Sequence, residues 1–338
     1  MRTATTDMIT RARAGDGDAF RQLTEPHRRE LHVHCYRMLG SFQDAEDALQ
    51  DTLLSAWRGI GAFQERASIR TWLYRIATNR CLDALRSANR RPAAPWDISE
   101  IEPPEPTRLG EAVWIEPFPD AVLEGAINTP LGPAARYEQT EAISLAFVTA
   151  LQLLPARQLA VLILRDVLGY HAKEVADMLD TTVESVTSAL KRARAGLQRH
   201  QLPPTGNHEP PPAPGSAAEQ ALVAKFTRAY SAGDINALLA LLTDDIYLSM
   251  PPIPLEYHGR TDVARFYATV LRPEWTYDFV PTRANGQPAL GTYLRASAGI
   301  RHGIGLVVLT LSGDQISAIT RFDAGVLPSF GLPRSLPR

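Results

Sequence analysis

The stretch LPARQLAVLILRDVLGYHAKEVADMLDTTVESVTSALKRARAGL, residues 154–197, decides the fold of the middle of the chain. Its apolar residues recur at helical spacing, and a glycine at 169 and a polar cluster at 180–182 interrupt the pattern. The pattern predicts helices over 156–167 and 172–179, a turn, and a third helix. Helices joined by so short a turn are typical of a helix-turn-helix.

The third helix has two different faces. Thr181, followed three residues later by Glu184, fits a capping box at its start. We expect one stripe to face the core: Val183, Val186, Leu190 and Leu197. The opposite face carries short polar groups and then cations: Glu184, Ser185, Thr187, Ser188, Lys191, Arg192 and Arg194. Such a helix can reach base edges with its first turn while its cations lie over phosphates, although a solvated helix can share the pattern.

A second informative segment lies far upstream, at 44–57. Its apolar side chains recur at helical spacing, and we expect them to be buried: Ala45, Leu49, Leu53 and Trp57. Another face is acidic and carries Asp44, Asp47 and Asp51. Like charges three and four residues apart destabilise a helix slightly. The acidic face is therefore more plausible against a cationic partner.

A loop at 61–68 follows, and it contains the aromatic residue Phe63. The next segment, 68–86, predicts a helix with an apolar side formed by Ile69, Trp72, Leu73, Ile76, Leu82 and Leu85. The same helix is cationic, with Arg70, Arg75, Arg80 and Arg86. Charge is thus segregated along the chain, with arginines in the helical modules and acids in the segment between them.

The sequence DAEDALQDTLLSAW, then SIRTWLYRIATNRCLDALR, then the helix-turn-helix resembles the extracytoplasmic-function (ECF) group of bacterial sigma factors. The resemblance covers about the first three-fifths of the chain. It implies two all-α domains, sigma region 2 at 8–91 and sigma region 4 at 140–200, joined by a linker at 92–139. It also implies core RNA polymerase, through its beta-prime clamp helices and its beta subunit, and promoter DNA as partners.

The family's functional residues map onto this chain at three places. The resemblance assigns core-polymerase binding to Asp47, Gln50, Asp51 and Leu54. It assigns contacts with the −10 element to Phe63, Arg66, Ser68, Asn79, Arg80, Asp83 and Arg86. It assigns contacts with the −35 element to Ser185, Thr187, Ser188, Lys191 and Arg192. Many members carry an arginine where this chain has Thr187, so no particular −35 sequence transfers.

The linker is long for this family and rich in proline and acids, which predicts a largely non-helical segment. A disordered spacer is one interpretation. The patch of Trp114, Ile115 and Phe118 is too apolar for a mere spacer. We expect it to pack against the carboxy-terminal domain or the polymerase, toward whose active-site cleft the family threads its linker.

A proline-rich tether at 201–216 leads to a different kind of domain. Residues 217–242 predict two helices, broken at 231–234 and capped by Asp234. A strand at 246–250, a helix at 263–271 and four further strands follow. The segments AYSAGDINALLALLTDDIYLSMPP and YHGRTDVARFY resemble the SnoaL-like domain. That resemblance implies a cone-shaped α+β fold at 217–328, with one curved sheet around a cavity.

Tyr230, Tyr247 and His302 are candidate cavity residues. Related cavities carry out acid–base chemistry, but a fold does not grant a function. We expect no catalytic activity and no cofactor, and a small-molecule ligand of this domain is a possible partner. His32 and His34 are two apart on a helix and point away from each other, so no metal site is expected.

The 338 residues suggest two or three domains, and a net charge of −2 does not by itself indicate DNA binding. Two cysteines within predicted helices, no signal peptide and no membrane-length apolar run indicate a cytoplasmic protein. We therefore interpret the chain as a multidomain sigma factor whose activity the carboxy-terminal domain modulates. A ligand-responsive repressor, or a SnoaL-like enzyme fused to a DNA-binding module, remains the alternative.

Overall fold

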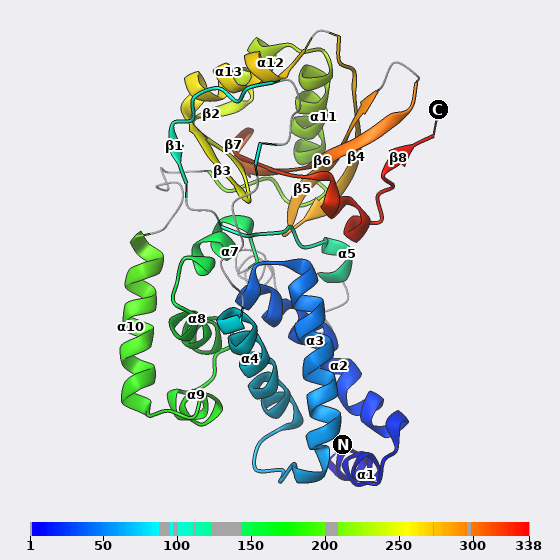
Figure 1. The fold of residues 1–338 in the computed structure, drawn as a ribbon, viewed down its shortest axis with the longest axis vertical. Coiled ribbons are helices and arrows are strands. Elements are labelled where there is room, and N and C mark those ends of the chain that lie inside the picture. Colours follow the sequence, from blue (N-terminus) through cyan, green and yellow to red (C-terminus); the bar gives the residue numbers. More distant parts are fainter. Residues whose placement is uncertain are drawn as a thin grey trace. The chain divides into compact units, whose positions relative to one another are not determined.

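The computed structural model describes residues 2–87, 95–96, 101–110, 113–123, 143–199, 209–272, 274–295 and 299–337. They form two compact units, one helical and one built on a β-sheet (Figure 1). The helical unit comprises Met1–Arg91, Val122–Glu138 and Ala146–His200. The second unit comprises Pro92–Ala121, Gln139–Leu145 and Gln201–Arg338. The linker is thus divided between the two units, and part of the tether lies outside the described residues.

The first half of the helical unit consists of α1 (Arg2–Arg13), α2 (Gly17–Leu39), α3 (Phe42–Gly59) and α4 (Ile69–Ser87). Local sequence sets the boundaries between them. The Asp16 carboxylate accepts hydrogen bonds from the first backbone N–H groups of α2, and Gly40 ends that helix with a φ of 73°. Ser41 then caps α3 by accepting from the Asp44 N–H at 3.1 Å.

The core of this half is closely packed. Tyr36, Leu49, Leu73 and Tyr74 are fully buried, as are the free thiols Cys35 and Cys81. Of the α3 residues predicted to be buried, Ala45 and Leu49 are, while Leu53 and Trp57 are half-buried. His34 is also buried and lies 2.9 Å from the Thr78 hydroxyl. Burial lowers its pKa to about 3, so the ring is neutral in the folded protein.

The second half contains α7 (Leu145–Gln152), α8 (Ala156–Leu162), α9 (Ala172–Met178) and α10 (Val183–Arg199). Helix α8 continues into a π-helical turn over Ile163–Val167, labelled η2, and Gly169 follows with a φ of 73°. The helix-turn-helix is therefore confirmed. The predicted cap is wrong by one residue, because the Thr182 hydroxyl, not that of Thr181, accepts from the Ser185 N–H at 3.2 Å.

The predicted core stripe of α10 is also wrong at its first residue, Val183. Val183 is 41% exposed because it occupies the first turn, outside the packed side of the helix. The buried side consists of Val186, Ala189, Leu190, Ala193 and Gly196. Asp180 adopts a left-handed backbone, with a φ of 48°, and turns the chain between α9 and α10.

The second unit packs α11 (Ala217–Ser231), α12 (Ile235–Ala240) and α13 (Gly259–Val270) on one side of a mixed sheet (Figure 1). The Asp234 carboxylate caps α12 as predicted, accepting from the Ala237 N–H at 2.9 Å. Six long strands form the sheet: β2 (Leu242–Met250), β3 (Ile253–His258), β4 (Tyr277–Ala284), β5 (Gln287–Arg295), β6 (Arg301–Ser312) and β7 (Gln315–Phe322).

With the short strand β1 (Arg108–Leu109), the strand order is β1-β3-β2-β7-β6-β5-β4, and only β2 and β7 run parallel within it. The carboxy-terminal segment adds the 3₁₀ helix η3 (Ala324–Phe330) and the short strand β8 (Ser335–Leu336), which pairs with β6. Strand β3 was not predicted from the sequence. The helix-covered face of the sheet holds the core, which includes Phe226, Leu248, Val307 and Ile319.

Part of the linker belongs structurally to the sheet. Strand β1 (Arg108–Leu109) extends the sheet by pairing antiparallel with β3. The Arg108 guanidinium contacts the Glu256 carboxylate, and the Tyr257 hydroxyl donates to the Pro104 carbonyl at 2.8 Å. The first part of the linker is therefore held by main-chain and side-chain contacts.

A second attachment lies at the β4–β5 hairpin. Its two-residue turn is Asn285-Gly286, and both residues have positive φ, as a type I′ turn requires. The Asn285 side chain accepts from the Phe118 N–H and donates to the Ile143 carbonyl, both at 2.7 Å. Asp120, which begins the short helix α5 (Asp120–Leu123), accepts from the Gly286 N–H at 2.8 Å.

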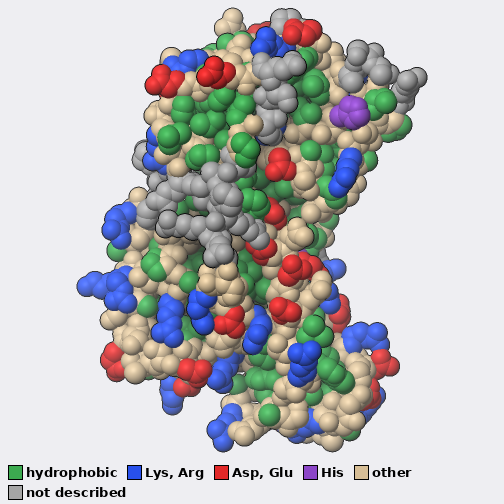
Figure 2. Space-filling view, viewed as in Figure 1, with side chains coloured by type: hydrophobic (Ala, Val, Ile, Leu, Met, Phe, Trp, Pro, Cys, Tyr) green, Lys and Arg blue, Asp and Glu red, His purple; other side chains and the backbone are tan. Residues whose placement is uncertain are grey.

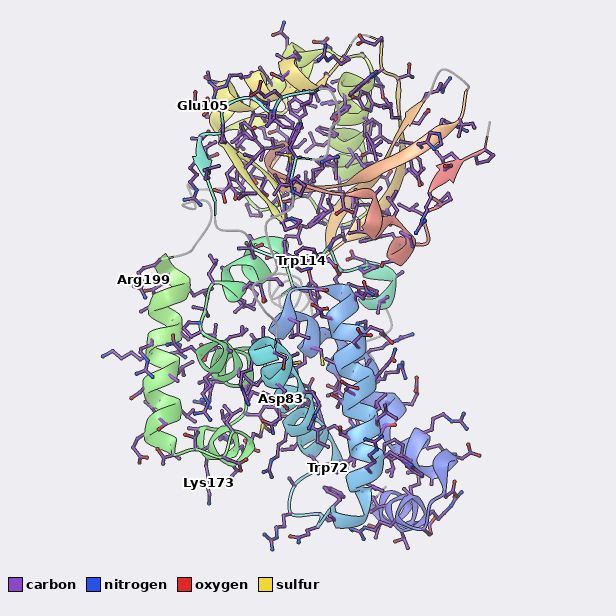
Figure 3. All side chains as sticks on the ribbon, in the orientation of Figure 1. Trp72, Asp83, Glu105, Trp114, Lys173 and Arg199 are labelled. Carbon is purple, nitrogen blue, oxygen red and sulfur yellow. The ribbon has the colours of Figure 1, made fainter. Side chains whose placement is uncertain are left out.

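Phe118 of the apolar linker patch is thus held against the carboxy-terminal domain. Phe118 is fully buried and Ile115 is 2% exposed, and Trp114 beside them is half-buried (Figure 3). A plain spacer would leave these side chains in water. The sequence left two docking surfaces open, the carboxy-terminal domain and the polymerase, and Phe118 lies against the first of them.

Replacing Asn285 by alanine should destabilise the second unit. The change removes two buried hydrogen bonds and leaves the Phe118 N–H and the Ile143 carbonyl without these partners. Each such loss costs about 1–3 kcal/mol, so we expect a total of roughly 2–5 kcal/mol. Urea denaturation followed by circular dichroism measures the loss in the free energy of unfolding. Asn236→Ala, at an exposed position of α12, is the control, and equal midpoints for the two variants would contradict the expectation.

Candidate nucleic-acid and polymerase interfaces

The predicted polymerase-binding residues share one exposed face of α3. Asp47, Gln50, Asp51 and Leu54 are spaced three, four and seven residues apart, which places them on one side of the helix. All four are exposed, and Leu54 exposes 53% of its surface. The face is therefore acidic with an apolar side chain at its end. This composition suits a partner that offers cations around an apolar contact.

The loop before α4 is organised by an aromatic contact. Phe63 is only 6% exposed, and its ring centroid lies 4.9 Å from that of Trp72. Arg13 donates to the Phe63 carbonyl and forms an ion pair with Glu65 at 3.1 Å. The Phe63 side chain thus faces the protein interior in this conformation.

The polar residues of the loop differ from Phe63. Arg66 and Ser68 are exposed. The Ser68 hydroxyl accepts from the Thr71 N–H at 3.0 Å and so caps α4. Arg66 is therefore the loop side chain best placed to contact an external partner.

The carboxy-terminal half of α4 carries the other predicted −10 residues. Arg80 and Arg86 are exposed and flank Asp83, at 3.9 Å and 3.2 Å from its carboxylate. Asn79 is half-buried beside them. Trp72 and Asp83 both project from α4 in Figure 3. This half of α4 presents two guanidinium groups and an amide, which can contact phosphates and unstacked bases.

The predicted −35 residues of α10 are all exposed: Ser185, Thr187, Ser188, Lys191 and Arg192. Lys and Arg side chains gather over α10 in the space-filling view (Figure 2). The Thr187 hydroxyl donates to the Val183 carbonyl at 2.9 Å. Arg194 is held by two hydrogen bonds of 2.8 Å to Asp166. Within the described part of the chain, Lys191 and Arg192 form no ion pair, so unlike Arg194 they are available to contact a phosphate.

Sequence reasoning missed Lys173, an exposed cation on α9 that faces outward beside the same module (Figure 3). It also missed that α4 contacts the helix-turn-helix. The Arg75 guanidinium lies 3.1 Å from the Asp180 carboxylate, at the turn before α10. No periodicity in the sequence reveals such a pair, because its residues are 105 positions apart.

A second contact between α4 and this module involves Arg70. Its guanidinium forms an ion pair with Glu30 at 2.9 Å and lies 4.8 Å from the centroid of the Tyr74 ring. It also donates to the Tyr170 hydroxyl at 3.4 Å, and the Tyr74 and Tyr170 rings meet edge to face at 5.9 Å. The Arg75–Asp180 ion pair and the contacts of Arg70 and Tyr74 with Tyr170 thus join α4 to the helix-turn-helix.

The candidate cavity residues do not come together. Tyr230 lies among aromatic rings on the helix-covered face of the sheet. Tyr247 projects from the opposite face, because its neighbours Ile246 and Leu248 are in the core and side chains alternate along a strand. His302 is exposed and lies 3.2 Å from the Ser335 hydroxyl on β8.

Within the described ranges, no helix combines the length and apolar composition needed to cross a bilayer. That part of the chain also brings together no group of three or more His, Cys, Asp or Glu side chains that could hold a metal ion. His32 and His34 are both buried in α2. His32 lies 3.6 Å from the Glu46 carboxylate, whereas His34 contacts Thr78.

An exposed acidic helix, a cationic helix and a helix-turn-helix in one unit are what a promoter-reading subunit of RNA polymerase requires. The family comparison agrees: Sigma-70 region 2 matches residues 23–91, Sigma-70 region 4 matches 144–197 and the SnoaL-like domain matches 223–319. The chain belongs to the ECF RNA polymerase sigma factors and carries a SnoaL-like domain.

Particular relatives show how far the similarity extends. The chain is 40% identical to the ECF RNA polymerase sigma factor SigG of Mycobacterium tuberculosis over 337 residues, which covers 96% of this chain and 86% of the relative. It is 36% identical to SigM of the same species over 186 residues, covering 55% of this chain and 79% of SigM. The first match includes the SnoaL-like domain.

A solved structure has a similar fold over most of the chain. The crystal structure of the Mycobacterium tuberculosis ECF sigma factor SigJ aligns with a TM-score of 0.57 and 20% identity, covering 91% of this chain and 97% of SigJ. The predicted fold class, helical sigma domains followed by an α+β SnoaL-like domain, is therefore confirmed.

Proposed function

We propose that this sigma factor binds core RNA polymerase through the exposed face of α3 defined by Asp47, Gln50, Asp51 and Leu54. The beta-prime clamp helices are the proposed partner. Two carboxylates four residues apart repel each other by about 0.2–0.5 kcal/mol, and a cationic partner relieves that repulsion. Exposed Leu54 supports the proposal because it supplies an apolar contact beside the charges. This partner places the action of the protein in the cytoplasm.

Replacing Asp47 and Asp51 together by alanine should weaken the complex with core polymerase about ten-fold, since the charges steer and orient the encounter. The Kd is measured by fluorescence anisotropy with labelled sigma factor. The control is Asp7→Ala with Glu25→Ala, which removes two exposed charges from other helices of the same unit. If both double variants bind equally well, α3 is not the polymerase-binding helix.

We further propose that α10 contacts the −35 element and that α4, with Arg66 before it, contacts the −10 element. The exposed Lys191 and Arg192 support the first assignment. Arg80, Arg86 and Asn79 support the second. Both surfaces combine guanidinium groups with short polar side chains, as phosphate and base contacts require.

Arg192→Ala should weaken promoter binding of the holoenzyme by roughly 5- to 100-fold if the side chain contacts a base, since one base contact is worth about 1–3 kcal/mol. If it contacts a phosphate, the salt dependence should flatten by about one charge. Binding is measured across several salt concentrations. Arg228→Ala, at an exposed position of α11, removes the same charge elsewhere. Equal curves for the two variants would exclude Arg192 from the interface.

The contact between α4 and the helix-turn-helix carries a further part of the proposal: the described conformation is closed. The names of the two promoter elements place them about 25 base pairs apart, or roughly 85 Å along B-form DNA at ~3.4 Å per base pair. The two DNA-facing modules here touch through Arg75 and Asp180 at 3.1 Å. The helical unit must therefore open before it can contact both elements.

The linker attachments support a role for the SnoaL-like domain in this opening. The linker is the covalent connection between the two modules, and the domain holds it at β1 and at Asn285. Threading the linker toward the polymerase cleft requires that it leave the domain or carry the domain along. The domain thus modulates the sigma factor by retaining its linker, and this role requires no catalysis.

Locking the closed conformation should abolish transcription. In Arg75→Cys with Asp180→Cys, a short reducible bis-maleimide joins the two modules, while the buried Cys35 and Cys81 react slowly. Run-off transcription with core polymerase should be lost on cross-linking and return on reduction. The single-cysteine variants treated with the reagent are the control. A cross-linked protein that transcribes normally would contradict the closed-state proposal.

A further inference from the structure

One cation of the SnoaL-like domain lies on the face of the sheet that the helices cover. Arg321 is directly opposite Val307 in the β6–β7 register and two residues beyond Ile319. Val307 and Ile319 are both members of the core. Paired residues and alternate residues share a face of the sheet, so Arg321 projects from the core side. Sequence analysis did not identify this residue.

The surroundings of Arg321 are aromatic and apolar. Its guanidinium donates to the Ile304 carbonyl at 3.2 Å. The Tyr230 ring lies 5.1 Å from Tyr277 and 5.3 Å from Phe279, perpendicular to both. Ser231 donates to the Tyr277 carbonyl at 3.2 Å, which fixes the end of α11 over the start of β4.

The positive charge of Arg321 affects the pKa of two of these tyrosines. Burial raises the pKa of Tyr230 to about 12, and Arg321 acts in the opposite direction. Burial also raises the pKa of Tyr277, again against an opposing effect of Arg321. The guanidinium is therefore close enough to both hydroxyls for its charge to be felt, in agreement with the strand register.

Several side chains on this face of the sheet are only partly buried. Tyr230, Phe279, Ile304 and Arg321 are half-buried, whereas Phe226, Tyr267 and Val307 nearby are buried. We name the four half-buried residues the Arg321 face. A planar cation beside partly accessible ring surfaces combines the two features that recognise a flat organic anion: a fork of N–H donors and edge-to-face aromatic contacts.

We propose that the Arg321 face binds a small aromatic carboxylate, whose carboxylate contacts the Arg321 guanidinium while its ring packs against Tyr230 and Phe279. A neutral aromatic molecule would lose the charged hydrogen bonds, and a small carboxylate without a ring would lose the apolar contact. The site goes beyond the proposed function, and only its effect on transcription rests on that function.

Isothermal titration calorimetry of the full chain tests the site with 1-naphthoate, its neutral analogue 1-naphthalenemethanol, and acetate. We expect saturable binding of naphthoate, with both other compounds at least about ten-fold weaker, because charge-assisted hydrogen bonds contribute roughly 1.5–3 kcal/mol. No saturable binding of naphthoate up to its solubility limit, or equal binding of naphthoate and the alcohol, would overturn the proposal. This comparison requires no variant.

Variants then locate the site. Arg321→Gln should weaken naphthoate binding by at least about ten-fold and leave the weak binding of the alcohol unchanged, and Arg321→Lys should restore only part of the loss. Arg295→Gln is the matched control, since Arg295 is an exposed arginine of the same sheet that pairs with Asp278 at 3.2 Å. Naphthoate binding that is equal in Arg321→Gln and Arg295→Gln would place the site elsewhere.

A variant that does not fold is recognised by its circular dichroism, and Phe279→Leu then replaces it. That change keeps the charge and removes one ring, so naphthoate should bind more weakly while acetate is unaffected; unchanged naphthoate binding would count against the site. Binding is measured without polymerase or DNA. Failure here leaves the cross-linking result for the closed conformation standing, and failure of the cross-linking experiment leaves this site standing.

Discussion

A single buried amide joins the linker, at Phe118, and the chain just after the linker, at Ile143, to the SnoaL-like domain. Asn285 accepts from the Phe118 N–H and donates to the Ile143 carbonyl, so residues 25 positions apart meet at one side chain. The amide can do this because the tight β4–β5 turn holds Asn285 in a left-handed backbone, a conformation that asparagine tolerates better than most residues. The positions of Phe118 and Ile143 against the domain depend on this turn.

The contacts that close the helical unit are of a different kind. The Arg75–Asp180 pair is exposed, with 48% and 78% of the two side chains accessible, and such pairs contribute about 0–1 kcal/mol. The Arg70 contact with Tyr170 adds a cation–π interaction of about 0.5–1 kcal/mol at a partly exposed site. The buried rings of Tyr74 and Tyr170 meet in the same interface, so exposed ion pairs and buried aromatic packing both contribute to it.

Much of the fold, and the exposed faces of single helices, could be predicted from the sequence because they depend on residues close together in the chain. The exposed faces of α3 and α10 were predictable because burial of one side leaves the other in solvent. The cap of α10 was misplaced by one residue because Thr181 and Thr182 are adjacent and only the backbone distinguishes them. Strand β3 was not predicted because it contains Pro254, and proline is untypical of a strand. Since β3 pairs on one side only with the short strand β1, few of its backbone N–H groups are needed as donors there.

Features that depend on distant residues were not predictable in this way. The burial of Phe63 against Trp72, the Arg75–Asp180 pair and the linker at Asn285 each join separate segments. The inward position of Arg321 depends on the register of β6 and β7, which shifts at Thr310. Counting alternate residues along the sequence no longer tells which face of the sheet a side chain lies on once the strand contains such a bulge.

The double attachment at Asn285 also has a mechanical meaning. Because Phe118 and Ile143 are hydrogen-bonded to the same side chain, a pull on either residue is borne by the SnoaL-like domain. A force that pulls the linker away from the domain at Phe118 would act on the Asn285 amide, on the Asp120–Gly286 hydrogen bond and on the buried Phe118 ring together, so the force needed for detachment is set by the whole cluster.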